Sequence, residues 1–346
     1  MDSAPGAAWA RVTVVPDNER RCTAGDAHST APPLVALTGA TGFIGTALLS
    51  RLTGAGWGVR ALYRHRTGRH PTPLPAVEWV QGDLEDRRGL EDLVAGTEAV
   101  IHCAGAVRGA RRAEFDRVNA EGAGRVARAA ALLPRSPRFL LMSSLAARMP
   151  ELSDYAGSKW RGECAVKAAS DHLRWTVLRP AAVFGPGDRE LLPLFRCMAL
   201  GFAPVPAAAR GRFSLIHVED LAEAVLRWLD ADTGYGMTFE LDDGHPSGYD
   251  WDTVLLLAAR ALRDGRPVRR VRVPTHLLGA AASANLRAAR ILGYAPMLTP
   301  GKLREIMHPD WLGDSRAFTH ATGWHPSIDL ESGLARSYGR HAVEAT

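Results

Sequence analysis

A tyrosine and a lysine four residues apart, Tyr155 and Lys159, form the pair best suited to chemistry in this chain. Residues at this spacing lie on the same face of a helix. A neighbouring ammonium favours the phenolate and lowers the pKa of a tyrosine from its usual value of about 10. The pair therefore predicts a phenol that exchanges a proton, and the alternative is an ordinary exposed helix pair.

The choice of lysine supports the chemical interpretation. Only three of the 42 basic residues are lysines, at positions 159, 167 and 302. An ammonium is a compact charge, whereas the arginine guanidinium is a larger planar fork. We infer that position 159 requires an ammonium.

The elements that must position this pair alternate between strand and helix. Apolar runs predict strands over 34–37, 59–63, 77–80, 99–103, 138–142 and 175–178, and helices are expected over 43–53, 87–94, 114–133 and 153–169. The strands are almost continuously apolar, which is typical of a parallel sheet covered on both faces. The sequence therefore predicts an α/β fold with a Rossmann-type doubly wound parallel sheet.

The pattern changes after Pro180, where one strand over 213–218 and helices over 191–200, 219–229, 251–263 and 276–292 are expected. We predict a smaller, mostly helical C-terminal substrate lobe built from residues 185–211 and 233–346. Residues 34–184, with a contribution from 212–232, form the predicted NAD(P)-binding domain. Residues 1–33 have no periodicity and are predicted to be a disordered N-terminal extension.

Composition excludes several classes of function. The net charge is +5, but the basic residues are scattered and no aromatic residues are interleaved with them, so no nucleic-acid partner is predicted. The four cysteines have neither paired nor metal-ligand spacing, which predicts no metal and a reducing, cytoplasmic location. No apolar run reaches the length of a membrane span, so no membrane partner is expected.

A glycine-rich turn follows the first predicted strand and opens a helix. Its sequence is Thr38-Gly39-Ala-Thr-Gly42-Phe-Ile-Gly45. Gly39 permits a tight turn, Gly42 lets the backbone approach a pyrophosphate, and Gly45 lets helix and strand pack closely. The helix N-terminus adds free N–H groups for that pyrophosphate. This context favours dinucleotide binding over a tight turn without a ligand.

Arginines after the second strand indicate which dinucleotide is bound. An acid commonly stands here to bind the adenosine ribose, yet no carboxylate lies between Arg60 and Arg69. Arginine binds a 2′-phosphate through charge-assisted contacts. We therefore predict NADP(H) as the preferred cofactor, with NAD(H) as the alternative, and Arg64 before Arg66 as the phosphate ligand. A solvated basic loop is the competing interpretation.

Taken together, the chain from about Leu34 to Leu334 resembles the short-chain dehydrogenase/reductase superfamily, in its extended or atypical branch, the NAD-dependent epimerase/dehydratase type. The motifs that match in order are Thr38-Gly-Ala-Thr-Gly-Phe-Ile-Gly45, Gly82-Asp83-Leu84, His102-Cys-Ala-Gly105, Val118-Asn119, Met142-Ser143-Ser144, Tyr155-x-x-x-Lys159, Leu178-Arg-Pro180, Gly185-Pro-Gly-Asp188 and Ile216-His-Val-Glu-Asp220.

The resemblance implies a cofactor site. Asp83 and Leu84 would lie along the adenine, Ala104 and Gly105 would line the cofactor, and the stretch from Pro180 to Val183 would face the nicotinamide carboxamide. The cofactor-binding residues that it implies, with Arg64 added from the argument above, are Thr38, Gly39, Thr41, Gly42, Phe43, Ile44, Gly45, Arg64, Asp83, Leu84, Ala104, Gly105, Ser143, Tyr155, Lys159, Pro180 and Val183.

The resemblance also implies Ser144, Tyr155 and Lys159 as catalytic residues for hydride transfer. Tyr155 would act as general acid or base, and Ser144 would hydrogen-bond the reacting oxygen. Because Ser143 is adjacent, the serine assignment stays open by one position. Glu163, on the same helix as Tyr155, is expected to make a surface or dimer contact. A homodimer formed through that helix is an analogy with the superfamily.

Two departures from the family's patterns narrow the reaction. Leu145 stands where the dehydratases of the family carry an acid, and Ala182 replaces the asparagine with which the epimerases hold a nucleotide diphosphate. We therefore predict an NADPH-dependent oxidoreductase that acts on a carbonyl or secondary alcohol of a small, relatively apolar substrate. The alternatives are a nucleotide-sugar epimerase or dehydratase and a non-catalytic NADP-sensing regulator.

Overall fold

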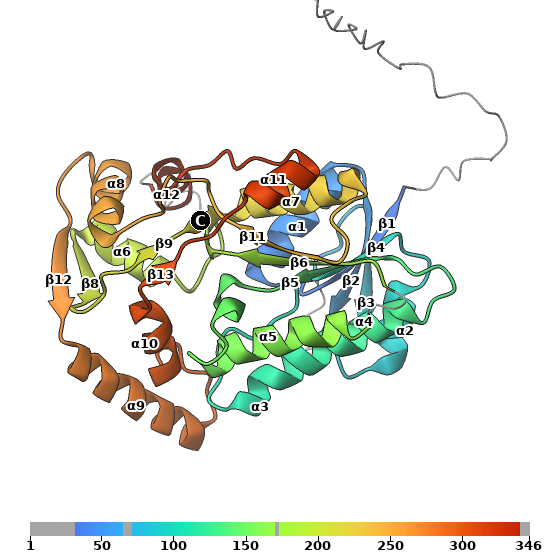
Figure 1. Cartoon of the computed structure of the whole chain (residues 1–346), viewed down its shortest axis with the longest axis horizontal. Coiled ribbons are helices and arrows are strands. Elements are labelled where there is room, and N and C mark those ends of the chain that lie inside the picture. Colours follow the sequence, from blue (N-terminus) through green and yellow to red (C-terminus); the bar gives the residue numbers. More distant parts are fainter. Residues whose placement is uncertain (1–31, 65–70, 170–172, 340–346) are drawn as a thin grey trace, which may run out of the picture. The chain divides into compact units, whose positions relative to one another are not determined.

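Seven parallel strands form the central sheet of the computed structural model, which describes residues 32–64, 71–169 and 173–339 (Figure 1). Their order is β11-β6-β5-β4-β1-β2-β3, which confirms the predicted Rossmann-type doubly wound sheet. The strands are β1 (Leu34–Thr38), β2 (Gly58–Tyr63), β3 (Val77–Gln81), β4 (Ala99–His102), β5 (Arg138–Met142), β6 (Trp175–Pro180) and β11 (Met237–Leu241).

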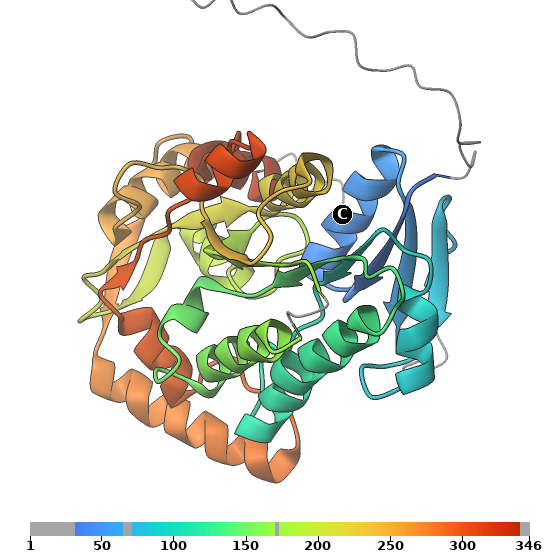
Figure 2. The same ribbon diagram turned by 45° about the vertical axis from the view of Figure 1, so that its right-hand side comes forward.

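Helices cover both faces of this sheet (Figure 2). On one face lie α1 (Phe43–Gly54) and α7 (Val218–Ala231), and on the other lie α2 (Arg87–Val94), α4 (Ala123–Ala131) and α5 (Asp154–Lys167). Val35 and Leu37 are buried in the first core, whereas Ala36 between them is buried in the second. Strands such as β1 are therefore apolar on both sides, because each face of the sheet has its own core.

The long helix expected over 114–133 is irregular. It consists of α3 (Arg112–Phe115), a π-helical turn η1 (Asp116–Gly122) and α4. A π-helical turn inserts a residue into the helical ladder and commonly occurs at a functional site. Here it contains Asn119, whose side chain reaches out of the helix as described below.

The C-terminal half adds a third core and several short strand pairs. Parallel pairs form between β7 (Ala182–Phe184) and β10 (Leu215–His217), between β8 (Phe202–Pro206) and β12 (Arg269–Val273), and between β9 (Arg212–Phe213) and β13 (Asp310–Trp311). The remaining helical segments are η2 (Leu145–Arg148), α6 (Leu192–Leu200), α8 (Trp251–Arg263), α9 (Thr275–Leu292), α10 (Pro300–Met307), α11 (Arg316–Thr322) and α12 (Leu330–Tyr338).

One expectation for this half is corrected. The single strand predicted over 213–218 is split into β9 and β10 by Ser214. Strand β11 lies within residues assigned to the substrate lobe, yet it pairs with β6 as the edge of the central sheet. The described residues from Pro33 onward form one compact unit, and its division into cofactor and substrate lobes stays a prediction.

The predicted disordered extension, apart from Pro32 and Pro33, lies outside the described residues. Within the described ranges, no helix has the length and the apolar character that crossing a bilayer requires.

Candidate functional site

The site begins where β1 and β4 end side by side. Thr38 is the register partner of His102, and its Oγ1 lies 2.8 Å from His102 Nδ1. The same oxygen accepts a hydrogen bond of 3.2 Å from the backbone N–H of Ala104. The chain leaves these two strands toward opposite sides of the sheet, which is the position where doubly wound folds bind ligands.

The glycine turn is tightly packed at Gly39 and Gly45 and less crowded at Gly42, where a Cβ atom would lie 3.2 Å from Gly39 O. Gly39 has φ of +75°, and a Cβ atom there would lie 2.6 Å from the nitrogen of Ala104. A Cβ at Gly45 would lie 2.0 Å from Gly39 O. Gly42 caps α1, and no side chain in the described part of the chain caps this helix end. The first N–H groups of α1, from Phe43 and Ile44, therefore remain for an anion.

The predicted adenosine end of the site lies at β2 and β3. Asp83 follows β3, and its Oδ1 accepts backbone hydrogen bonds from Glu85 at 2.7 Å and Asp86 at 3.0 Å. Arg64 is exposed and follows β2 directly. Arg66 and Arg69 lie outside the described residues. The glycine turn and this edge together fit a dinucleotide, with Thr41 exposed between them.

Lys159 is buried beneath the end of β5. Its Nζ donates a 3.0 Å hydrogen bond to the carbonyl of Met142. Burial lowers the pKa of Lys159, against the opposing effects of Cys103 and Glu163. A Cβ atom at Gly105 would lie 3.1 Å from the Lys159 ammonium, so a side chain there would displace the ammonium slightly.

Asn119 in the π-helical turn fixes the loop after β4. Its Oδ1 accepts from the N–H of Ala106 at 2.8 Å, and its Nδ2 donates to the carbonyl of Ala106 at 2.9 Å. The same Nδ2 lies 2.8 Å from Ser158 Oγ, which belongs to the Tyr155 helix. The Asn119 amide therefore joins the loop of Ala104 and Gly105 to α5. We infer that Asn119 has a structural role.

Tyr155 stands half-buried at the start of α5, with its ring edge-on to Phe115 at 6.3 Å between ring centres. Burial raises the pKa of Tyr155. The Ser144 hydrogen bond and the charge of Lys302 act in the opposite direction, while Glu305 and Glu190 raise the pKa further. The phenol is therefore protonated at neutral pH and can serve as an acid.

The cation beside the Tyr155 ring is Lys302, with its Nζ 5.9 Å from the ring centre. The sequence analysis assigned the lowering of the Tyr155 pKa to Lys159 and missed Lys302. Lys302 reaches the site from α10, about 150 positions away in the chain. Only the rarity of lysine in the sequence could have drawn attention to it.

Lys302 is held in place by Glu305. Its Nζ lies 3.0 Å from Glu305 Oε2, and the other carboxylate oxygen accepts a hydrogen bond from Ser153 Oγ. Ser153 is also the N-cap of α5, through its bond to the N–H of Ala156. Burial acts to lower the pKa of Lys302, but Glu305 outweighs it and the pKa is raised. Lys302 therefore stays charged.

The two adjacent serines have different partners. Ser143 Oγ donates a 2.6 Å hydrogen bond to Glu163 Oε1. Arg179 binds the same carboxylate with two hydrogen bonds of 2.9 and 2.8 Å. Glu163 is only 1% exposed, so the expected surface or dimer contact is wrong. The Ser143 hydroxyl is thus bound to an anion, and that of Ser144 lies toward Tyr155.

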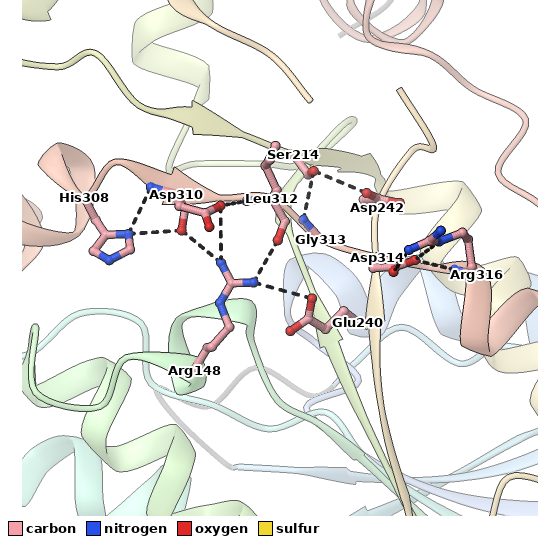
Figure 3. A network of polar contacts seen from close by, with 10 residues as sticks. All are labelled: Arg148, Ser214, Glu240, Asp242, His308, Asp310, Leu312, Gly313, Asp314 and Arg316. Carbon is pink, nitrogen blue, oxygen red and sulfur yellow. Dashed lines mark hydrogen bonds and ion pairs between the residues drawn. The ribbon is translucent and has the colours of Figure 1, made fainter. Parts of the chain in front are cut away.

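A polar network attaches the C-terminal segment to the loop after Ser144 (Figure 3). Arg148, at the end of η2, donates to the carbonyls of Leu312 and Asp310 at 2.9 Å each. It also lies 3.6 Å from a carboxylate oxygen of Glu240. Since the segment after α10 is anchored in this way, the network holds α10, and with it Lys302, against the Tyr155 site.

Of the remaining predicted residues, Leu84 packs close to Gly122 of the π-helical turn. Pro180 is buried at the end of β6, and Val183 lies in β7 directly beyond it. The structure thus brings Ser144 to Tyr155, whereas Lys159 of the same helix is bonded to Met142 at the end of β5.

Comparisons with known proteins agree with this geometry. The model of the NAD dependent epimerase/dehydratase family matches residues 35–238. Ceramide reductase of Caulobacter vibrioides is 36% identical over 309 residues, which cover 84% of this chain and 94% of that protein. UDP-glucose 4-epimerase of Vibrio cholerae is 26% identical over 270 residues, covering 70% and 79%.

Among solved structures, UDP-glucose 4-epimerase of Thermotoga maritima superposes with a TM-score of 0.69 at 18% identity, covering 90% of this chain and 99% of that one. At this identity the likeness shows the shared fold. The family match spans most of the sheet and includes the glycine turn, Ser144, Tyr155 and Lys159. The chain therefore belongs to the NAD dependent epimerase/dehydratase family and is an NAD(P)-dependent oxidoreductase of the extended short-chain dehydrogenase/reductase type.

Proposed function

We propose that this enzyme uses NADPH to reduce a carbonyl group of an apolar, lipid-like substrate, with Tyr155 as the general acid. The observation that carries the proposal is the environment of the Tyr155 phenol, which lies between the Ser144 hydroxyl and the Lys302 ammonium. Such a phenol donates its proton to an oxygen on which negative charge develops. The relative named for ceramide, a lipid, supports the substrate class.

Each residue near Tyr155 has a defined task in this reaction. The nicotinamide supplies the hydride when it is bound. Ser144 donates a hydrogen bond to the substrate oxygen, and Tyr155 gives that oxygen its proton. Lys302 stabilises the phenolate that remains. Lys159 is bonded to Met142 at the end of β5 and lies beside Gly105, where it would hold the nicotinamide ribose when the cofactor is bound.

The substrate lobe offers an apolar space beside this site. A cleft of about 420 Å³ lies between α9 and α10, and Leu152, Leu303 and Met307 are among its lining residues. Leu152 precedes Ser153, which is bonded to Glu305 of the Lys302 cluster. Arg304 and His308 also line the cleft, and most of its exposed lining is apolar, so it suits a hydrocarbon chain that ends in a polar group.

A nucleotide-sugar epimerase is the second candidate, because one relative has that name. Against it stands Ala182, exposed in β7, where the epimerases of the family carry an asparagine. The neighbouring Arg179 is occupied by Glu163. The residues around β7 therefore provide few donors for a diphosphate.

A substrate screen tests the two candidates directly. The purified full chain is assayed for NADPH oxidation with a long-chain ketone, a short-chain ketone and UDP-glucose. We expect turnover with the ketones and a lower KM for the longer chain. Interconversion of UDP-glucose without net NADPH consumption, combined with no activity on either ketone, would favour the epimerase instead.

Arg64 is expected to determine the choice of cofactor. The Arg64→Ala variant should raise the KM for NADPH by about tenfold, because a charge-assisted contact to the 2′-phosphate is lost. The KM for NADH should not change, since NADH lacks that phosphate. Steady-state kinetics with both cofactors, beside Arg196→Ala as a control on an exposed helix, measure the effect. An equal loss with both cofactors would contradict a role in phosphate binding.

A further inference from the structure

The positive charge of the chain is concentrated in one segment of the C-terminal half. Residues 265–308 contain eight lysines and arginines but a single acid, Glu305, although the whole chain has a net charge of only +5. Seven of these eight cations are exposed, whereas Glu305 is buried and bonded to Lys302. The surface of the segment thus carries exposed cations and no exposed carboxylate of its own, and the remaining cation, Arg270, pairs with Asp252 of α8.

Helix α9 presents an apolar stripe on this surface. Both views show α9 at the periphery, with α10 packed on its inner side (Figures 1 and 2). Its buried residues are Ala282 and Ala289, and Leu277 and Ile291 on the outer face are 55% and 83% exposed. The positions 277, 281, 284, 288 and 291 follow a spacing of four and three residues, so they share one side of the helix.

Cations flank the stripe. The residues His276, Arg287 and Arg290 lie to one side of it at helical spacing and are exposed. Further exposed apolar side chains stand on the adjoining segments, and these are Val271, Leu292, Tyr294, Met297 and Ile306. An apolar stripe bordered by arginines, without acids, is the pattern of a helix that lies in the headgroup region of a bilayer.

We propose that this α9 face, formed by the exposed residues of segment 265–308, docks on an anionic phospholipid surface. Charge complementarity favours such a surface, because each exposed cation gains from the negative potential of the headgroups. A second copy of the same face would bring like charges together, which disfavours a dimer through α9. The docking is peripheral, so it agrees with the lack of a spanning helix among the described residues.

Docking through this face would bring the enzyme to a membrane-borne substrate, and this step of the inference rests on the proposed function. The apolar cleft lies between α9 and α10, and α10 carries Lys302 to Tyr155. A protein lying on its α9 face would therefore place this cleft, lined by Gly279 and Ser283 of α9, next to the bilayer. A lipid-like ketone could then pass from the membrane to the phenol without its hydrocarbon chain crossing water.

Vesicle sedimentation tests the docking without any turnover. The full chain is mixed with phosphatidylcholine vesicles, alone or containing phosphatidylglycerol. We expect binding to the anionic vesicles only, weakened by added salt. In the double variant Leu277→Glu/Ile291→Glu, the bound fraction should fall by at least about fivefold, because two new charges lie in the apolar stripe. Leu132→Glu, equally exposed at the end of α4, should bind like the wild type.

Retained NADPH binding shows that the double variant is folded. Failure of the wild type to bind anionic vesicles, or equal binding of the double variant, would overturn the proposal. A wild-type dimer that the double variant converts to a monomer, with vesicle binding unaffected, would assign the face to a second copy instead. Vesicle binding combined with inactivity toward every ketone would refute the proposed function and leave the docking intact.

Discussion

Turnover is expected to fall by a factor of about 10² to 10⁴ when Tyr155 is replaced by phenylalanine, because the reacting oxygen then loses its proton donor. The aromatic ring keeps its edge contact with Phe115, so the packing at the start of α5 is preserved. NADPH binding should survive, since Lys159, Gly39 and Gly45 are untouched. The measurements are kcat with the ketone identified by the screen and a fluorescence titration with NADPH.

The matched control is Ser143→Ala. Its hydroxyl is bound to Glu163 rather than to Tyr155, so a loss of turnover there would report damage to the buried Glu163–Arg179 pair and not to the proton donor. Near-normal turnover in Tyr155→Phe, with the fold intact, would remove Tyr155 from the mechanism. A loss of NADPH binding in step with turnover would instead assign the tyrosine to the cofactor site.

The cofactor half of the protein could be predicted from sequence because its signals are local. The apolar strands, the helix over 87–94 and the glycine turn each lie within about a dozen residues and follow a simple periodicity. The short strands of the other half, such as the two-residue β9 and β13, are too brief to show any period. The π-helical turn at Asn119 could not be predicted either, because it does not change the pattern of apolar residues along the helix.

The errors at the site concern contacts between distant segments. Glu163 looked like a surface acid because an acid is rarely buried unless it is paired, and its partner Arg179 comes from another element. Lys302 was overlooked because nothing local connects α10 with α5. Their approach depends on the network of Arg148, which joins η2 to the segment after α10. Local periodicity carries no information on such contacts.

Lys302 and Glu305 are predicted to shift the acidity of Tyr155 in opposite directions. Replacing Lys302 by methionine removes the cation that lowers the Tyr155 pKa, so that pKa rises. Replacing Glu305 by glutamine removes an anion that raises it, so the pKa falls. In the oxidation direction Tyr155 acts as the base, and the rate increases as pH rises through its pKa. The rising limb should therefore move to higher pH in Lys302→Met and to lower pH in Glu305→Gln.

Opposite shifts of the rising limb in the two variants distinguish an electrostatic effect from damage to the fold. A structural defect would lower the rate of a variant without moving its pH–rate profile along the pH axis. We expect kcat for reduction at neutral pH to fall roughly 10- to 100-fold in Lys302→Met, since the phenol becomes a weaker acid and its phenolate loses a partner. Lys302→Arg keeps the positive charge, so the rising limb of its pH–rate profile should lie close to that of the wild type. If Lys302→Met left the pH profile in place, the cation above the Tyr155 ring would have no part in proton transfer. The lowering of the Tyr155 pKa would then have to come from Lys159, four residues along the same helix, as the spacing of the two residues predicts.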